Sequence, residues 1–232
     1  NLMSFIRIIN KDPKIFIAEQ LIKKGYIIAD IKLEFDESGN IKDNYKIKGL
    51  VKDGNIELFK KYNLSKIDYI FQIDAKSFEF KDINLFLNNK NILIPQFLIS
   101  KKKDKYFISG ELNNKKITIL KNDIEIFFEK DQLGLDIQKI VFSSKTNFDF
   151  SLDNKFNFNN LKFNSVIELD NLEFKNSFKL KSIFPKINKN IFFKNHVIKL
   201  SYDKENLDVT GKGNVLFQEK LDKIKYEISK KE

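Results

Sequence analysis

Apolar and polar residues alternate along most of this chain, most clearly between residues 146 and 183, where Phe and Leu alternate with Asp, Asn, Lys and Glu. Successive side chains of a strand point to opposite faces of its sheet. The pattern therefore predicts half-buried strands with one apolar face. Four pairs interrupt the alternation and are predicted as turns, because Asn and Asp tolerate left-handed backbone angles: Asp153-Asn154, Asn159-Asn160, Asp170-Asn171 and Asn176-Ser177.

The same alternation predicts strands before and after this stretch, separated by turns at residues 36–40 and 53–55. The clearest predicted strands are 27–35, 45–51, 56–58, 67–75, 78–80, 85–87, 92–94, 124–128, 137–142, 191–200 and 207–217. The tail fits a helix by Leu221, Ile224 and Ile228 or a strand by Ile224, Tyr226 and Ile228, and a strand is favoured because the elements before it are β.

One helix is predicted, at about residues 13–24, lying on the sheet or plugging its end. Asp12 suits the N-cap, Pro13 the first helical position and Gly25 the stop, and Lys23 and Lys24 complement the negative end of the helix dipole.

These elements predict an all-β fold, a long twisted antiparallel β-meander curled into an apolar groove, with a short helix near the N-terminus. Residues 1–232 are expected to form a single β-rich segment, with Pro185 as the best candidate for a weak boundary. About fifteen short strands exceed what one compact sandwich usually carries, which favours a long curved sheet. The alternative is a β-sandwich in which the apolar face is the packed core.

Charge and composition narrow the possible partners. Lys and Arg number 42 against 32 Asp and Glu, and Arg7 is the only arginine. Nucleic-acid binding is not expected, because arginine is the preferred residue for phosphate and base contacts. There is no cysteine, and no apolar run is long enough for a membrane-spanning helix. Because the chain starts at Asn1, we expect it to be a segment of a longer protein whose membrane anchor lies elsewhere.

No catalytic or metal-binding motif is present, so we expect no enzyme activity and no cofactor. His196 is the only histidine, and its neighbours Asn195 and Val197 are not ligands or catalytic partners. Residues 36–40 resemble the start of a calcium loop, but the twelfth position, where a bidentate Glu is needed, is Ile47. The run at residues 101–103 is a solvated lysine turn or, alternatively, a contact for lipid headgroups.

The predicted site is the apolar face, and the expected ligand is the acyl chains of a phospholipid. On alternating strands only one parity faces the groove. The residues assigned to it are Tyr69, Phe71, Ile73, Phe148, Phe150, Leu152, Phe156, Phe158, Leu161, Phe163, Leu172, Phe174, Phe178 and Leu180.

The chain resembles the AsmA-like superfamily (TamB- and YhdP-like proteins), particularly the YhdP-type central domain. The resemblance lies in a predicted helix ending at Gly25, then residues 31–40 and 44–51, and in the later meander of Phe and Leu strands. It implies a periplasmic β-sheet curled around an apolar interior, anchored in the inner membrane. It also implies transport of phospholipid towards the outer membrane, with an outer-membrane protein as a possible partner.

Two functions follow from these expectations. The first is a non-catalytic lipid-binding and transport segment that carries phospholipid between the inner and outer membranes. The alternative is a structural role, as a scaffold for outer-membrane biogenesis or as a surface β-sandwich module.

Overall fold

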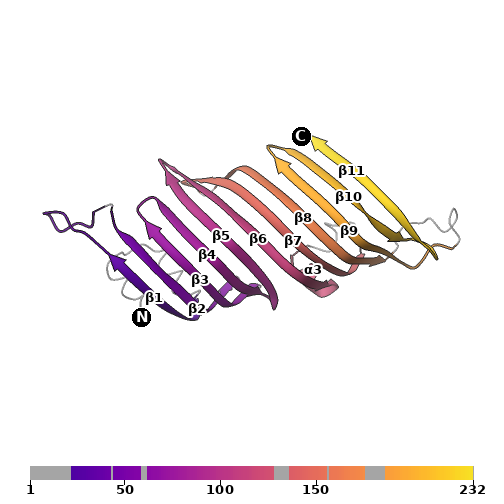
Figure 1. The fold of residues 1–232 in the computed structure, drawn as a ribbon, viewed down its shortest axis with the longest axis horizontal. Helices are drawn as coiled ribbons and strands as arrows, with labels where there is room; N and C mark the ends of the chain where they lie inside the picture. Colours follow the sequence, from indigo (N-terminus) through magenta and orange to yellow (C-terminus); the bar gives the residue numbers. More distant parts are fainter. Residues whose placement is uncertain are drawn as a thin grey trace. The chain divides into compact units, whose positions relative to one another are not determined.

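The computed structural model describes residues 22–42, 44–58, 62–127, 136–155, 157–175 and 186–231. It confirms the all-β, antiparallel prediction (Figure 1). The strands are β1 (Ile22–Lys32), β2 (Lys46–Leu58), β3 (Tyr62–Asp74), β4 (Ser77–Leu87), β5 (Lys90–Lys102), β6 (Lys105–Leu120), β7 (Asp136–Asp153), β8 (Phe158–Lys175), β9 (Asn190–Asp203), β10 (Asn206–Leu216) and β11 (Leu221–Lys231). The helix within the described residues is α3 (Lys121–Phe127).

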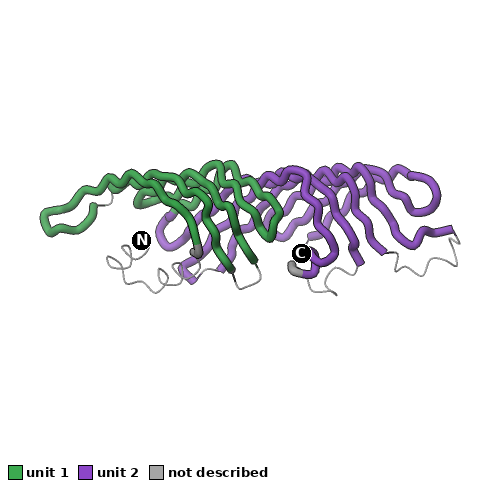
Figure 2. The backbone as a smooth tube through the Cα atoms, turned by 90° about the horizontal axis from the view of Figure 1, so that it is seen from below, with its two compact units in different colours: residues 1–100 green, residues 101–232 purple. Residues whose placement is uncertain are grey.

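The chain divides into two compact units, residues 1–100 and 101–232 (Figure 2). Unit 1 contains β1–β4 and most of β5, and unit 2 contains the end of β5, β6–β11 and α3. Within each unit, strand order in the sheet follows sequence order, as expected of a meander. The weak boundary predicted near Pro185 lies outside the described residues.

Two hairpin turns are built in the same way around an aspartate. The Asp36 carboxylate accepts hydrogen bonds from the backbone N–H groups of Ser38 and Asn40 and from the Asn40 amide, at 2.8 to 3.2 Å. The Asp153 carboxylate likewise accepts from the N–H groups of Lys155 and Asn157 and from the Asn157 amide, at 2.8 to 2.9 Å. The turn predictions at residues 36–40 and Asp153-Asn154 are therefore confirmed.

Three other predicted turns are wrong, because the chain continues through them as a strand. Residues 53–55 lie inside β2, and Asn159-Asn160 and Asp170-Asn171 lie inside β8. Each site is instead a β-bulge, at which the register between neighbouring strands shifts. Asp53 and Asn160 adopt positive φ angles of 52° and 53°. Bulges and turns both need residues that tolerate left-handed backbone angles, and Asp and Asn meet this need in either case. The sequence pattern of a bulge is therefore interpreted as a turn.

The bulges keep the apolar residues on one face although their spacing in the sequence is irregular. Leu169 and Leu172 are three residues apart, so strict alternation would put them on opposite faces. Asp170 is the extra residue, because Leu169 is opposite Phe142 whereas Asn171 is opposite Val141. Residues 146–153 and 158–175 therefore belong to two long bulged strands, β7 and β8, instead of several short ones.

The helix predictions require two corrections. Residues 22–24, the end of the predicted helix, belong to β1, and the rest of that prediction lies outside the described residues. The strand predicted at 124–128 is wrong for residues 124–127, which form part of α3 in mid-chain. The Asp123 carboxylate accepts a hydrogen bond from the Leu120 backbone N–H at 2.9 Å, half of a capping box that favours helix initiation here.

Glycines on the apolar side let aromatic rings lie flat against the sheet. A Cβ atom at Gly49 would collide with the Phe71 ring and with the backbone carbonyl of Ile28. A Cβ atom at Gly211 would collide with the Tyr226 ring. In both cases the glycine faces an aromatic residue directly across the strand pair.

The apolar side of unit 2 is covered by no second sheet among the described residues, because β6–β11 are consecutive neighbours in one layer. The strands of this unit are also bent along their length (Figure 2). β-Bulges bend strands and increase their twist. Those of β8 and β9 lie side by side, at Asp170 and Asn195. Among the described residues of this unit, the sandwich core considered as an alternative has no partner layer.

Candidate functional site

The register of unit 2 brings apolar side chains of β6–β9 to one surface, the apolar face. Phe148 is directly opposite Phe163, which is opposite Tyr202, and Ile167 is opposite Ile198. We define the apolar face by its larger members: Ile108, Leu112, Ile117, Ile140, Phe142, Phe148, Phe150, Leu152, Phe158, Phe163, Ile167, Leu169, Leu172, Phe174, Phe193, Ile198, Leu200 and Tyr202.

Aromatic rings make a continuous surface at the end of this face near the β7–β8 turn. The ring centroids of Phe148 and Phe150 are 6.2 Å apart, and those of Phe150 and Phe158 are 5.0 Å apart. Phe163 stacks on Tyr202 at 5.5 Å. Stacked aromatic pairs add about 0.5–1.5 kcal/mol to what burial alone provides. These rings therefore hold one another in place while their outer surfaces remain available.

A belt of small polar residues crosses the middle of the apolar face on β6–β8. The Asn114 amide donates to the Ser144 hydroxyl at 3.0 Å, and the Thr146 and Ser165 hydroxyls are 2.8 Å apart. The buried Asn114 Oδ1 atom has no hydrogen-bond partner within the described structure. Sequence reasoning missed this belt. The sequence feature that could have revealed it is the pair Ser144 and Thr146, which alternate in step with Phe142 and Phe148 and therefore point to the same face.

Most of the site residues predicted for unit 2 lie on this one face. Phe148, Phe150, Leu152, Phe158, Phe163, Leu172 and Phe174 belong to it, and Leu161 lies beside the Asn160 bulge. Their exposure differs greatly: 68% for Phe158 but 5% for Phe174. Phe174 is thus a core residue in this unit. Phe156, Phe178 and Leu180 lie outside the described side chains.

Unit 1 has an apolar face of its own, which contains the other three predicted residues. Tyr69, Phe71 and Ile73 are opposite Val51, Gly49 and Ile47 of β2. The Tyr69 ring lies 6.1 Å from Phe71 and 5.6 Å from Phe80, between centroids. Burial raises the pKa of the Tyr69 hydroxyl, so this side chain stays neutral.

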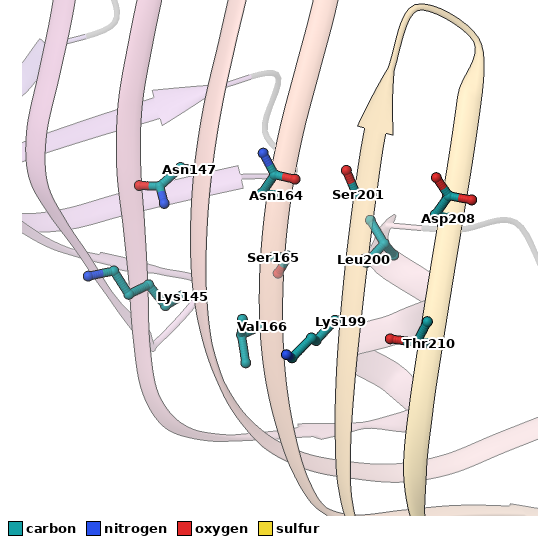
Figure 3. A pocket seen from close by; sticks show the side chains of 10 residues that line it. All are labelled: Lys145, Asn147, Asn164, Ser165, Val166, Lys199, Leu200, Ser201, Asp208 and Thr210. Carbon is teal, nitrogen blue, oxygen red and sulfur yellow. The ribbon is translucent and has the colours of Figure 1, made fainter. Parts of the chain in front are cut away.

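The opposite, polar face of unit 2 has a shallow hollow of about 400 Å³ over β7–β10 (Figure 3). Asn147, Asn164, Ser201 and Asp208 lie side by side there on four neighbouring strands. Lys145, which also lines the hollow, forms an ion pair with Glu111 at 3.2 Å. The described lining of the hollow contains amides, hydroxyls, lysines and the Asp208 carboxylate, which accepts a hydrogen bond from the Ser229 hydroxyl at 2.6 Å, and it contains no histidine.

His196 is a packing residue on the apolar side. Its side chain is 1% exposed, and its Nε2 atom is 2.9 Å from the backbone carbonyl oxygen of Asn214. The ring packs on Phe193 at 5.0 Å and covers Gly213, where a Cβ atom would collide with it. No described carboxylate or hydroxyl approaches its Nδ1 atom.

The described residues contain neither a candidate metal-ion cluster nor a candidate membrane-spanning helix. No three His, Cys, Asp or Glu side chains there are grouped closely enough to bind a metal ion. In the same residues, no helix has the length and apolar character that a membrane crossing requires.

Comparison with known proteins gives no relative: no family model, curated protein or solved structure matches this chain.

Proposed function

We propose that the chain is a non-catalytic lipid-binding segment whose apolar face holds the acyl chains of phospholipids. The observation that carries this proposal is a large apolar surface of aromatic and aliphatic side chains on a sheet with no second layer over it within the described part of unit 2. Exposed apolar patches of this kind mark binding surfaces in soluble domains. The strands of unit 2 are bent along their length (Figure 2), and we take the apolar face to be the inner side of this bend.

The chemistry of the face suits passage of lipid better than tight recognition. Its members on β6–β9 carry no charged side chain, so the face offers no charge that would select a headgroup. An acyl chain gains about 0.8 kcal/mol for each buried methylene. Such a surface binds chains through area alone and allows them to slide. This is the property required of a segment that carries phospholipid between an inner and an outer membrane through the periplasm.

The strip around Phe174 favours the structural alternative for that part of the face. Leu169, Phe174 and Ile191 are all buried, and the Phe174 and Phe193 rings stack at 5.8 Å. This strip stabilises the sheet as a scaffold. The lipid-binding part is therefore the aromatic half, between the polar belt and the β7–β8 turn.

Site-specific photo-crosslinking tests the proposal in the full-length protein in cells. A photo-reactive phenylalanine analogue is placed at Phe163 or Phe148, on the apolar face, and at Asn164 or Asn147, the adjacent residues on the polar face. We expect phospholipid adducts at the first two positions, detected by mass spectrometry, and none at the other two. Equal capture at both parities, or none at either, contradicts the proposal.

A charge on the apolar face should block lipid passage. We expect Phe148→Asp to abolish phospholipid capture at Phe163, because a buried unpaired carboxylate is strongly unfavourable. Asn147→Asp introduces the same charge on the opposite face and serves as the control. Phe148 is preferable to Phe174, whose substitution removes a buried core side chain. Retained capture in Phe148→Asp, with normal protein levels, speaks against a lipid path here.

A further inference from the structure

Two neighbouring turns of unit 2 combine lysines with exposed aromatic rings. The turn between β5 and β6 lies beside the end of β7, where Lys105 is opposite Asp153 and Tyr106 is opposite Leu152. The turn between β7 and β8 follows directly, with Leu152 opposite Phe158. We call the described residues 101–107, 153–155, 157 and 158 the lysine-aromatic tips.

The tips have a concentrated positive charge. Residues 101–105 and 153–155 contain five lysines and two aspartates. One of these aspartates, Asp153, is engaged in turn hydrogen bonds and lies beside Lys105. The turn between β9 and β10, residues 203–206, contains two acidic residues and one lysine. The positive charge is thus a property of these two turns and not of every turn in the unit.

Two of the lysines at the tips, Lys101 and Lys102, lie over aromatic rings, one on each side of the sheet. The Lys101 Nζ atom is 6.0 Å from the centroid of the Tyr106 ring, and the Lys102 Nζ atom is 5.5 Å from that of Phe107. Tyr106 belongs to the apolar side and Phe107 to the polar side, since neighbouring residues of a strand face opposite ways. Phe107 is 41% exposed and Phe158 68%.

Amphipathic surfaces of this composition lie at membrane interfaces. Aromatic rings insert at the headgroup level, while lysines reach the phosphates of anionic lipids. We propose that the lysine-aromatic tips of unit 2 bind the surface of an anionic lipid bilayer. Lys101, Lys102 and Lys103 supply the charge, and Phe107 and Phe158 enter the headgroup layer. This surface is additional to the lipid-binding face proposed above and does not depend on it.

The tips lie at the end of the apolar face, so binding of a bilayer there also predicts where lipid enters the face. Phe158 closes the aromatic half of the apolar face, through its 5.0 Å contact with the Phe150 ring. A bilayer that binds at the tips therefore meets that half of the face at its rim. Lipid then enters across the hairpin turns, and not through an edge strand of the sheet.

Vesicle co-sedimentation of the purified 232-residue chain tests the proposal. The vesicles are pure phosphatidylcholine or phosphatidylcholine mixed with phosphatidylglycerol. We expect binding to the anionic vesicles only, with an affinity that falls as salt is added. Each lysine near an anionic surface strengthens binding roughly fivefold. The triple variant Lys101→Gln, Lys102→Gln and Lys103→Gln should therefore bind about 100-fold more weakly.

The matched control is Lys139→Gln, Lys199→Gln and Lys212→Gln. These three lysines lie on the polar face of interior strands of unit 2 and have no ion pair among the described residues, so the control removes the same charge without disturbing the tips. A circular dichroism spectrum matching the wild type shows that each triple variant is folded. The proposal is overturned if the wild-type chain ignores anionic vesicles, if the tip variant binds like the wild type, or if both variants lose affinity equally.

A second pair of variants separates insertion from charge. Phe107→Ser with Phe158→Ser keeps every lysine, and we expect it to lose the part of the binding that persists at high salt. Unchanged binding at high salt excludes insertion of the rings and overturns the proposal as stated. Photo-crosslinking at Phe163 remains informative in either case, because it reports lipid on the apolar face and not contact with a bilayer.

Discussion

Single aspartates stabilise three of the described turns of this chain. Asp36 and Asp153 each bind two backbone N–H groups and the amide of an asparagine four residues later. Asp74 uses the same principle with the N–H groups of Lys76 and Ser77. These hydrogen bonds favour the ionised carboxylate, and they hold the pKa of all three side chains below the usual range.

The Asp153 turn should therefore stabilise the protein in a pH-dependent manner. Hydrogen bonds from Asn157 and Lys155, and nearby Lys105, lower the pKa of Asp153 from its ordinary value of 3.8. Its contribution is present above that value and is lost as the pH falls through the lower pKa of the folded state. We expect Asp153→Asn to lower the Tm at neutral pH, with a difference from the wild type that shrinks in acid.

Thermal unfolding followed by circular dichroism over a pH series measures this difference. Asp149→Asn is the control, because Asp149 lies on the same strand but outside the turn hydrogen bonds. If the difference in Tm between the wild type and Asp153→Asn stays constant down to the lowest pH, the charge of Asp153 does not contribute to stability.

At the scale of the strand, bulges maintain the separation between the two faces. β2, β8 and β9 each contain a register shift at a residue with positive φ: Asp53, Asn160 and Asn195. Asp170 adds a second extra residue to β8. A one-residue change of register moves every later side chain to the other face. Each bulge therefore decides which residues contribute to the apolar face.

Deletion of one bulge residue should lower the free energy of unfolding far more than substitution of its side chain does. Deletion of Asp170 moves Leu172 and Phe174 out of phase with the rest of β8, and we expect it to cost about 3 kcal/mol or more. Asp170→Ala loses only an exposed ion pair with Lys116, with side chains 47% and 71% exposed, and should cost at most about 1 kcal/mol.

Urea denaturation of the two variants and the wild type measures both costs. A deletion variant as stable as Asp170→Ala would mean that the strand slips into a new register without penalty. The apolar face would then be far less specifically determined than the structure indicates.

At the scale of the whole molecule, the free edge of a sheet must be kept from pairing with other chains. β11 pairs with β10 along its full length and has no second partner among the described strands. Four of its eleven residues are lysines: Lys223, Lys225, Lys230 and Lys231. Charged residues, lysine above all, prevent edge-to-edge association of sheets.

Neutralising this edge should cause self-association. We expect the double variant Lys223→Val and Lys225→Val to elute earlier and at a mass that rises with concentration, because an uncharged β-branched edge accepts another strand. Light scattering after size-exclusion chromatography measures the mass. Lys199→Val with Lys212→Val makes the same change on the interior strands β9 and β10, and should leave the mass unchanged. Equal association of both variants would assign the effect to lost net charge.

The sequence by itself determined the all-β class, the antiparallel meander and the parity of most strands, because alternation with period two requires only local geometry. It also determined the turns at Asp36 and Asp153, whose hydrogen bonds lie within five residues. Phe148, Phe150 and Leu152 on β7 were predictable for the same reason, whereas Phe163, Leu172 and Phe174 on β8 share that face only because of the bulges at Asn160 and Asp170.

Only the tertiary structure decided whether an Asp or Asn pair is a turn or a bulge. Both use a left-handed backbone angle, and the difference lies in which distant strand pairs with the residues that follow, as Phe142 does with Leu169. The belt of Asn114, Ser144, Thr146 and Ser165 depends on the same pairing, since its members come together only across strands. The difference in exposure between Phe158 and Phe174 also depends on tertiary structure, because the residues that bury a side chain come from neighbouring strands.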